Sequence, residues 1–391
     1  MQEDVEEQQQ IAVDRIRRIL KSSEYQDFVN HYSAASLRFR DLPSDIKLTM
    51  YYQIYYGAGK LEDSLALYHD VLYDRRIVDI DTFLSSPEYM GVIGGGIYPR
   101  WKAEMRDFLS SESVQREWVF SGGISIGKSM TARLVALYKL YQVSCLHNPQ
   151  TEFGLDDNAN IVMAFIGSNK NTVEVCTLKP FVELMRMCDV FEEVNSQNKL
   201  ITYNGKRIPF YHNISDKVVN LGKNISVVIA SNDENLIGEN VFSILYDEAN
   251  GDNVMFELYN KVITQIKLRF DNAPFVYAAI IDGAPTKDDL IESYLSRLNQ
   301  YEKRFVKVTR FTKWEANPSL IDNSDGYFYV LNGSLSNPSS ILTDEQAKHW
   351  LDNPNDIPLN TEIVKVPMAY LSDFKNNLAY SLRDVAGVPT A

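Results

Sequence analysis

Hydrophobic residues follow two different patterns along the chain, and the change between them falls near residue 90. Within residues 1–90, apolar side chains recur three and four positions apart, as in Leu61–Asp74 and in the set Ile11, Ile16, Ile19 and Leu20. Residues with this spacing lie on one face of a helix. The first 90 residues are therefore predicted to form a helical region.

Beyond residue 90 the apolar residues gather into short continuous runs, which are typical of buried parallel strands. The predicted strands are 117–121, 161–167, 226–230, 242–246 and 275–281. Helical patterns lie between most of them, at 128–145, 171–188, 252–270 and 287–300. Strands that alternate with helices predict an α/β fold, in which helices cover both faces of a mainly parallel central sheet.

Two segments depart from this alternation. Asn204-Gly205 separates two short strand-like runs within 200–208 and predicts a hairpin at the edge of the sheet. After residue 310 the chain is rich in Pro, Asn and Ser, yet apolar residues persist, with strand-like runs at 327–331 and 362–366 and a helical pattern at 343–351. We predict three parts, namely the helical region at 1–90, a core at 91–310 and a smaller subdomain at 311–391.

The composition is that of a folded globular protein, since 45% of the 391 residues are hydrophobic and 23% are charged. The net charge of −13 argues against a general nucleic-acid coat, but it allows a motor that grips DNA through a few local contacts. The three cysteines form no C-x-x-C pair, so we expect reduced thiols in the core. No apolar run approaches the ~18 residues of a membrane span, and the acidic, Gln-rich start is no signal peptide. We expect a soluble, intracellular protein.

The strongest chemical signal is the run Gly122-Gly123-Ile124-Ser125-Ile126-Gly127-Lys128-Ser129, which fits the pattern G-x-x-x-x-G-K-[ST]. A strand-like run precedes it and a helical pattern starts at Met130, the context in which such a loop wraps nucleotide phosphates with its backbone N–H groups. This context favours nucleotide binding over a Gly-rich turn without a ligand. We assign nucleotide binding to all eight residues and to Met130. Lys128 would neutralise charge on the β- and γ-phosphates.

A second glycine-rich segment, Gly-Ala-Gly-Lys at 57–60, resembles part of a phosphate loop. It lacks a preceding strand and a following Ser or Thr. We interpret it as the end of one helix and the start of the next.

The second motif is the apolar run 241–246 followed by Asp247-Glu248. Asp247 suits Mg²⁺ binding, directly or through a bound water, alongside the Ser129 hydroxyl, and Glu248 suits polarising the attacking water. An Asp-Glu pair alone is weak evidence, because many strands end in a solvated acidic turn. After a good phosphate loop, and with two candidate strands between, the pair predicts hydrolysis of a nucleoside triphosphate.

Two further segments have two interpretations each. The apolar strand at 278–281 ends at Asp282, where a sensor of the γ-phosphate would lie, but Gly and Pro follow and an ordinary turn explains it equally well. Tyr98 and Trp101, shortly before the phosphate loop, could pack on an adenine ring or belong to the core of the first helix.

Taken together, these residues resemble the large terminase subunit of tailed bacteriophages, the ATPase that moves DNA into a prohead. The segments that carry the resemblance run from about Asp81 to the C-terminus, at 98–101, 117–123, 238–240, 246–250, 314–318, 366–367 and 382–387. The resemblance implies a RecA-like, additional-strand P-loop ATPase with a lid or linker subdomain. The implied cofactors are ATP and Mg²⁺.

The same resemblance implies the partners of a packaging motor. These are double-stranded DNA, the portal protein and a small terminase subunit, with the chain in a homo-oligomeric, pentameric ring on the prohead or a monomer in isolation. We expect it in the cytoplasm of the infected bacterial host, not as a stable part of the virion and not on a membrane.

Members of this family also carry a C-terminal nuclease, whose site needs several carboxylates around two metal ions. The best candidates after Glu248 are Asp322 and Asp325, which lie in turn-like sequence. We therefore expect no nuclease activity from this chain, either as an isolated motor domain or as the product of a split gene.

Two positions depart from the family pattern. Many large terminases carry a basic residue where this chain has Ile124, so the arginine finger must come from elsewhere, in cis from a residue such as Arg297 or in trans from a neighbouring subunit. Asp282 replaces a small hydroxyl residue at the coupling position. Other P-loop motors, such as a helicase or a DNA-transport ATPase, and a non-catalytic nucleotide-binding assembly protein are the alternative functions. The basic clusters at 15–18 and 303–304 are interpreted as solvated faces.

Overall fold

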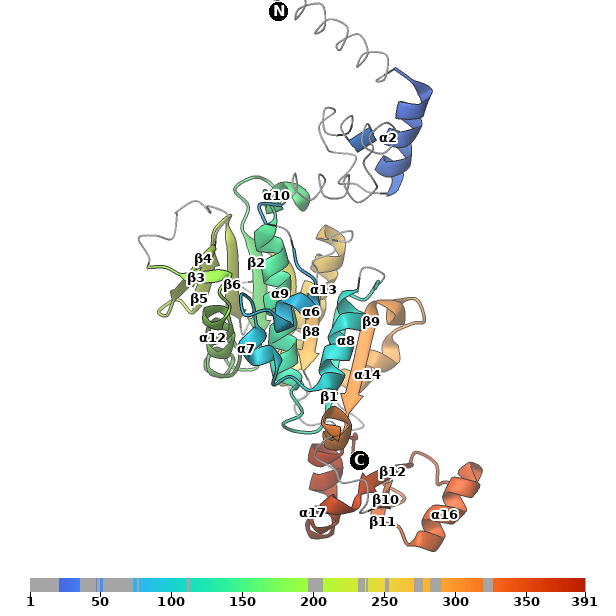
Figure 1. Ribbon diagram of the computed structural model, residues 1–391. Helices are drawn as coiled ribbons and strands as arrows, with labels where there is room; N and C mark the ends of the chain where they lie inside the picture. Colours follow the sequence, from blue (N-terminus) through green and yellow to red (C-terminus); the bar gives the residue numbers. More distant parts are fainter. Residues whose placement is uncertain are drawn as a thin grey trace, which may run out of the picture. The chain divides into compact units, whose positions relative to one another are not determined.

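The computed structural model divides into two compact units, one of residues 1–77 with 145–152 and one of residues 78–144 with 153–391. Figure 1 shows the chain coloured by sequence. The residues that the structure describes are 21–35, 47, 50–51, 73–75, 77–110, 113–195, 207–230, 236, 238–249, 253–270, 277–281, 290–318 and 326–390.

The first unit contains helix α2 (Ser23–Ala35) and the short helix α10 (Pro149–Glu152). Its described core is aromatic, because the rings of Tyr25 and Phe28 both pack edge-on against Tyr51, with centroids 5.2 and 5.4 Å away. Helix α2 agrees with the predicted helical region, whereas residues 11–20 and 57–60 lie outside the described residues.

The second unit is built on a nine-stranded sheet in the order β3-β4-β5-β6-β2-β7-β8-β1-β9. All neighbours from β6 to β9 are parallel, while β5 is antiparallel to β4 and to β6. The strands are β1 (Glu117–Gly122), β2 (Ile161–Ile166), β3 (Phe191–Glu193), β4 (Ile208–Asn213), β5 (Val218–Leu221), β6 (Ile225–Ala230), β7 (Asn240–Tyr246), β8 (Tyr277–Ile281) and β9 (Val306–Phe311).

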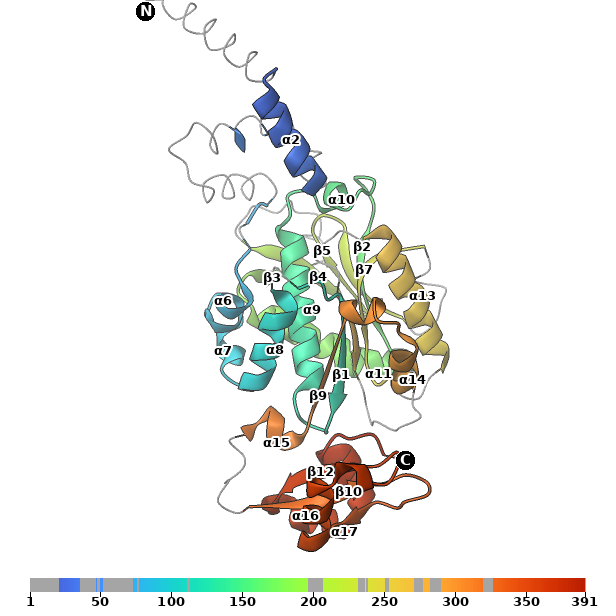
Figure 2. The same ribbon diagram turned by 90° about the vertical axis from the view of Figure 1, so that its right-hand side faces the viewer.

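Helices cover this sheet on two faces (Figures 1 and 2). Side chains of successive strand residues point to opposite faces. Trp118 of β1 stacks near Phe108 of helix α8, whereas its neighbour Glu117 accepts hydrogen bonds from Tyr259 and Tyr294 on the opposite side. The helices are α6 (Ile80–Ser85), α7 (Gly91–Gly94), α8 (Pro99–Leu109), α9 (Lys128–Cys145), α11 (Lys170–Val173), the π-helix η1 (Glu174–Leu178), α12 (Lys179–Met187), α13 (Asn253–Arg269), α14 (Leu290–Arg297) and the 3-10 helix η4 (Glu302–Phe305).

The sheet confirms the predicted fold class. All six residues of β1 and of β2 are buried, as continuous apolar runs in a doubly covered parallel sheet require. Strand β8 lies between β1, which leads into the phosphate loop, and β7, which carries the acidic pair. This is the additional-strand arrangement that the resemblance to large terminases implies.

Strands β3, β4, β5 and β9 were not predicted from the sequence. Strand β9 alternates between buried and exposed residues near its end, so it has no continuous apolar run. The predicted hairpin turn at Asn204-Gly205 lies outside the described residues. In this part of the sheet the structure describes antiparallel hairpins that join β4 to β5 and β5 to β6.

The C-terminal segment of this unit has its own three-stranded antiparallel sheet, in the order β11-β10-β12. Its strands are β10 (Tyr327–Asn332), β11 (Ser340–Ile341) and β12 (Glu362–Pro367), and its helices are α15 (Lys313–Ala316), α16 (Asp344–Asp352), η7 (Pro354–Asp356), η8 (Met368–Tyr370), α17 (Leu371–Asn376), α18 (Leu378–Tyr380) and the π-helix η9 (Ser381–Val385). A separate apolar cluster includes Trp314, Phe328 and Leu382. These elements match the predicted strands and helix, whereas the boundaries at 90 and 310 stay predictions.

Across the described stretches of the chain, no helix combines the length and the apolar character that crossing a membrane demands.

Candidate nucleotide site

The predicted phosphate loop connects the end of β1 at Gly122 to the start of α9 at Lys128. Its backbone turns through the left-handed region at Gly122 (φ 115°), Ser125 (φ 61°) and Gly127 (φ 95°). These turns bring the loop back to the first N–H groups of α9. The N-terminus of a helix attracts anions, because its N–H groups are unpaired and the helix dipole is positive there. The loop therefore has the form of a phosphate cradle.

The Lys128 side chain lies inside the curl of this loop and is only 8% exposed. Its ammonium group donates hydrogen bonds to the carbonyl oxygens of Gly122 at 2.5 Å and of Gly123 at 3.2 Å. Ser129, the next residue, is partly exposed in the first turn of α9. The charge and the hydroxyl that the motif requires thus belong to consecutive residues at the start of α9.

The acidic pair follows β7 at the same edge of the sheet, since β7, β8 and β1 run parallel. The Asp247 carboxylate accepts a hydrogen bond from the Thr177 hydroxyl at 2.9 Å, and the Asp247 N–H donates to the Ile166 carbonyl at 3.2 Å. Burial raises the pKa of the Asp247 carboxyl, while the hydrogen bond from Thr177 and the positive charge of Arg133 oppose this rise. Burial prevails, so the pKa of the Asp247 carboxyl lies above its ordinary value.

Glu248 is exposed and has a φ of 55°, in the left-handed region that residues other than glycine rarely adopt. Such a conformation costs about 1–3 kcal/mol and is concentrated at functional sites. The neighbouring Ala249 N–H donates to the Ile281 carbonyl at the end of β8. Glu248 thus lies just beyond the end of β7 and is exposed to solvent.

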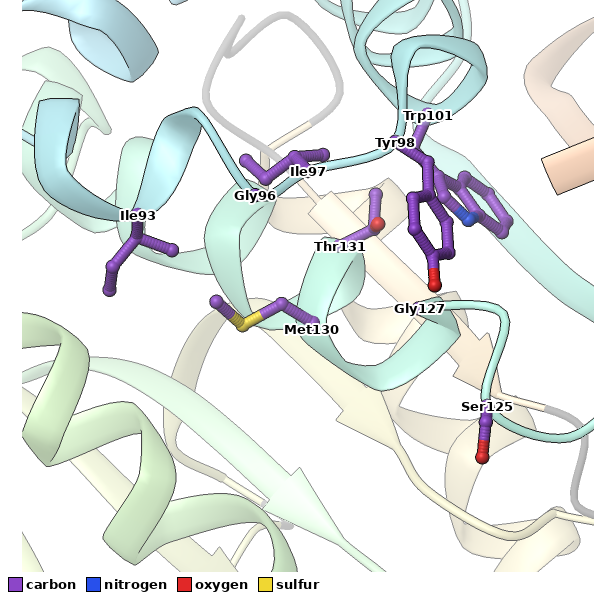
Figure 3. Close-up of a pocket in the computed structure, with 9 residues that line it drawn as sticks. All are labelled: Ile93, Gly96, Ile97, Tyr98, Trp101, Ser125, Gly127, Met130 and Thr131. Atoms are coloured by element: carbon purple, nitrogen blue, oxygen red, sulfur yellow. The ribbon is translucent and has the colours of Figure 1, made fainter. Parts of the chain in front are cut away.

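A pocket of about 460 Å³ lies beside the loop (Figure 3). The start of α8 contributes Tyr98 and Trp101 to its wall, and the side chain of Tyr98 extends toward Gly127. The lining residues are Ile93, Gly96, Ile97, Tyr98, Trp101, Ser125, Gly127, Met130 and Thr131. Three of the predicted nucleotide-contacting residues outside the loop, Tyr98, Trp101 and Met130, are therefore gathered in one mainly apolar wall.

Trp101 agrees with the core interpretation, whereas its packing on an adenine ring stays a prediction. It is 1% exposed and packs edge-on against Phe311, so it is a core residue. Its indole N–H also donates to the Ile126 carbonyl at 2.5 Å, and a Cβ on Gly127 would lie 3.4 Å from this nitrogen. Trp101 thus fixes the shape of the phosphate loop as well as lining the pocket.

The remaining predicted site residues are placed as follows. The Ile124 side chain is 45% exposed, and its N–H donates to the Asp384 carbonyl. The Arg297 guanidinium donates to the carbonyl and the hydroxyl of Ser293 within its own helix. Asp282 lies outside the described residues, as do Asp322 and Asp325. The functional roles assigned to all these positions stay predictions.

Three features of the site were not found from the sequence. Thr177 contacts Asp247 from a π-helix, and Arg133 donates to the Cys176 carbonyl at 2.9 Å from α9. The main chain at 384–387 covers the outer side of the loop. Arg133 could have been noticed as a charged residue in an apolar helix, whereas Thr177 carries no signal in the sequence.

The residues fit a magnesium ion shared between protein and nucleotide. The described residues contain no group of three or more His, Cys, Asp or Glu side chains that could hold a metal by themselves. Mg²⁺ in phosphate sites is usually held by one or two protein oxygens together with phosphate oxygens and water. Asp247 and Ser129 offer such oxygens at one edge of the sheet.

The profile of the family described as "Uncharacterized protein MJ0330, N-terminal P-loop domain" matches residues 102–336. The chain belongs to this family. The match includes the phosphate loop, the acidic pair and the strand inserted between them, so the core of this member is a P-loop domain. No curated protein matches the sequence.

Several solved structures that are similar to the chain are large terminases, the proteins that the sequence resembles. The large terminase of a thermophilic bacteriophage is 8% identical with a TM-score of 0.40, over 75% of this chain and 54% of that one. A mutant ATPase domain of the Thermus phage P74-26 large terminase is 15% identical with a TM-score of 0.38, over 63% of this chain and 90% of that one. The bacteriophage HK97 large terminase is 9% identical with a TM-score of 0.36, over 71% and 49%.

The chain thus spans about half the length of the two full large terminases. At these identities and TM-scores, the function has to be argued from the chain's own residues.

Proposed function

We propose that this chain hydrolyses ATP with the help of Mg²⁺. The observation that carries the proposal is the meeting of the phosphate loop and of Asp247-Glu248 at one edge of a parallel sheet, with a single strand between them. In open α/β sheets, ligands bind at the carboxyl ends of the strands. An apolar pocket adjoins the same loop and would take the adenine ring.

Each predicted residue has a role in this reaction. The backbone N–H groups of 122–129 and the ammonium of Lys128 bind the phosphates, while Ser129 and Asp247 hold the metal. Mg²⁺, when bound, neutralises charge that develops on the phosphoryl group. Glu248 polarises the attacking water.

Lys128 must exchange its partners when nucleotide enters the site. Its ammonium is paired with the carbonyl oxygens of Gly122 and Gly123. Phosphate oxygens are stronger acceptors for an ammonium than neutral carbonyls are, because the hydrogen bond is then charged on both sides. The hydrogen-bond partners of the Lys128 ammonium therefore differ between the empty and the nucleotide-bound loop.

We further propose that hydrolysis drives double-stranded viral DNA into a prohead, as in a terminase large subunit. The order of the segments around the two nucleotide motifs supports this role, and the short-range motifs alone do not distinguish it from other P-loop motors. The partners would be the portal protein and a small terminase subunit, with the chain acting as a ring in the cytoplasm of the bacterial host. Arg297 is engaged within its own helix, which favours an arginine finger from a neighbouring subunit.

The first test is Glu248→Gln, which keeps the size of the side chain and removes the charge that polarises water. We expect steady-state ATP turnover to fall by about 10²–10⁴-fold while the affinity for ATP changes little. Glu257→Gln, an exposed change on α13, is the matched control and should leave turnover intact. Turnover that survives in Glu248→Gln would show that Glu248 is not the catalytic carboxylate.

The motor role is tested by partners and by strand separation. A packaging motor should hydrolyse ATP faster when duplex DNA and portal are added, and it should translocate duplex without unwinding it. ATP-dependent separation of a forked duplex would instead identify a helicase.

A further inference from the structure

The π-helix η1 brings a buried hydroxyl against the proposed metal carboxylate. Thr177 is 1% exposed, and its Oγ1 donates a hydrogen bond to Oδ2 of Asp247 over 2.9 Å. We propose that Thr177 is a positioning residue, which fixes the Asp247 carboxylate in the orientation that binds Mg²⁺. This inference rests on the proposed function and adds a residue that no motif in the sequence assigns.

The need for such a residue follows from the small number of protein ligands. Mg²⁺ requires nearly octahedral geometry and short bonds of about 2.0–2.1 Å, so a misdirected carboxylate binds it poorly. The Asp247 side chain can rotate about two bonds, and the Thr177 hydrogen bond removes that freedom by engaging Oδ2. The carboxylate also accepts a hydrogen bond from the main-chain N–H of Glu248, and its remaining lone pairs are available to the metal. Residues that orient a metal ligand in this way typically contribute about 10–100-fold to metal affinity or activity.

The π-helix is itself held in place on two sides. Arg133, from the helix that begins at the phosphate loop, donates to the Cys176 carbonyl at 2.9 Å. Glu174 at the other end of η1 forms ion pairs with Lys217 at 2.7 Å and with Lys179 at 3.1 Å. Because Cys176 immediately precedes Thr177, the Arg133 contact fixes the hydroxyl relative to the phosphate loop.

The turn before η1 also leaves little room for movement. A Cβ on Gly167 would lie 2.7 Å from Cγ2 of Val173 and 3.5 Å from the Asp247 carbonyl oxygen. The segment that follows β2 therefore passes directly over the end of β7. Single turns of π-helix are often found at functional sites, where the extra residue redirects a side chain. Here the redirected side chain is Thr177.

The experiment compares Thr177→Val, which removes the hydroxyl at constant shape, with Thr177→Ser, which keeps it. Binding of a non-hydrolysable ATP analogue to the full chain is measured by calorimetry in EDTA and at increasing Mg²⁺ concentration. We expect Thr177→Val to raise the Mg²⁺ concentration at half-saturation by about 10-fold or more, with unchanged affinity in EDTA. Thr177→Ser should restore the wild-type dependence on Mg²⁺.

Thr309→Val is the matched control, because Thr309 is a buried threonine that accepts a hydrogen bond from Trp118 on another strand. It should leave the Mg²⁺ dependence unchanged. Equal Mg²⁺ dependence in wild type and Thr177→Val would overturn the inference, and so would an equal loss of affinity with and without Mg²⁺. If the affinity of the wild-type chain for the ATP analogue did not depend on Mg²⁺, the proposed function would be overturned as well.

Discussion

The main-chain N–H of Ile124 donates a hydrogen bond to the main-chain carbonyl of Asp384 over 2.6 Å. The main chains of the two segments approach closely here, because a Cβ on Gly123 would lie only 2.8 Å from the Val385 carbonyl oxygen. The resemblance to large terminases leads us to expect a basic side chain at the position of Ile124. In this chain the main chain of Ile124 is hydrogen-bonded to the C-terminal π-helix η9, and its apolar side chain is partly exposed to solvent.

Gly387 is the residue that permits this close approach. It has a φ of 64°, and a Cβ at this position would lie 2.2 Å from the nitrogen of Gly123 and 2.4 Å from Cα of Gly122. We expect Gly387→Ala to displace the phosphate loop and to weaken nucleotide binding by at least about 10-fold, or about 1.4 kcal/mol. Titration with a fluorescent ATP analogue measures this loss.

Gly154→Ala separates the contact from the backbone strain. Gly154 has nearly the same φ, 65°, but a Cβ there meets nothing within 4 Å. Both substitutions should carry the left-handed cost of about 1–2 kcal/mol in unfolding free energy, and only Gly387→Ala should also lose nucleotide affinity. Identical binding curves for the two variants would show that the C-terminal contact does not shape the loop.

The indole of Trp101 also contacts the phosphate loop, through its hydrogen bond to the Ile126 carbonyl. Trp101→Phe keeps an aromatic ring in the pocket wall but leaves the Ile126 carbonyl without the indole N–H as its donor. An unsatisfied buried group costs about 1–3 kcal/mol, so we expect nucleotide affinity to fall by about 5- to 150-fold. Binding calorimetry and thermal unfolding should be measured together.

Trp118→Phe is the control for the loss of buried ring area. Trp118 is also fully buried, and its indole N–H donates to the Thr309 hydroxyl at 3.0 Å, away from the loop. This variant should lose comparable stability and retain its nucleotide affinity. If both variants lost affinity equally, the effect would come from the core and not from the Ile126 contact.

Lys139 gives the stability of the chain a specific pH dependence. Burial, with a smaller contribution from the charge of Arg116, lowers the pKa of Lys139 to about 7. Between pH 7 and about 10.4 the folded chain carries a neutral amine and the unfolded chain a charged one. Unfolding then takes up a proton, so the free energy of unfolding rises with pH, by about 1.4 kcal/mol per pH unit for this group. Below pH 7 both states are protonated and the contribution is constant.

Lys139→Met removes this dependence. We expect the variant to be more stable than wild type at pH 7 and the difference to narrow as the pH rises toward 10. Urea unfolding at several pH values measures it, and Lys348→Met, at an exposed position of α16, should leave the slope unchanged. Parallel stability curves for wild type and Lys139→Met would contradict the buried titration.

Much of the fold was predictable from local pattern. Strands β1, β2 and β7 carry continuous apolar runs because both faces of the sheet are covered, and such runs are visible in the sequence. Strand β9 was missed because it lies at the edge of the sheet and has partly exposed, alternating residues. The short strands β3 and β5 are too brief to produce a pattern.

The site was predictable only where its chemistry depends on neighbours in sequence. The phosphate loop and the pair Asp247-Glu248 are local motifs. Their spacing and flanking elements were sufficient to predict that each follows a strand of the central sheet. Thr177 and Gly387 act through contacts with distant parts of the chain, and neither position looks unusual by itself. For Trp101 the sequence left open whether it packs on the adenine or belongs to the core, and its hydrogen bond to the loop required the tertiary structure.

The loop that begins at Gly122 takes its final shape from chain that is synthesised much later. The Gly123 N–H donates to the Phe311 carbonyl, and the Ile124 N–H donates to the Asp384 carbonyl. Contacts between residues so far apart in sequence form slowly and late in folding. On the ribosome, a nascent chain that has not yet reached Asp384 therefore lacks one of these two hydrogen bonds. We expect the loop to gain its affinity for nucleotide only after nearly the whole second unit has emerged.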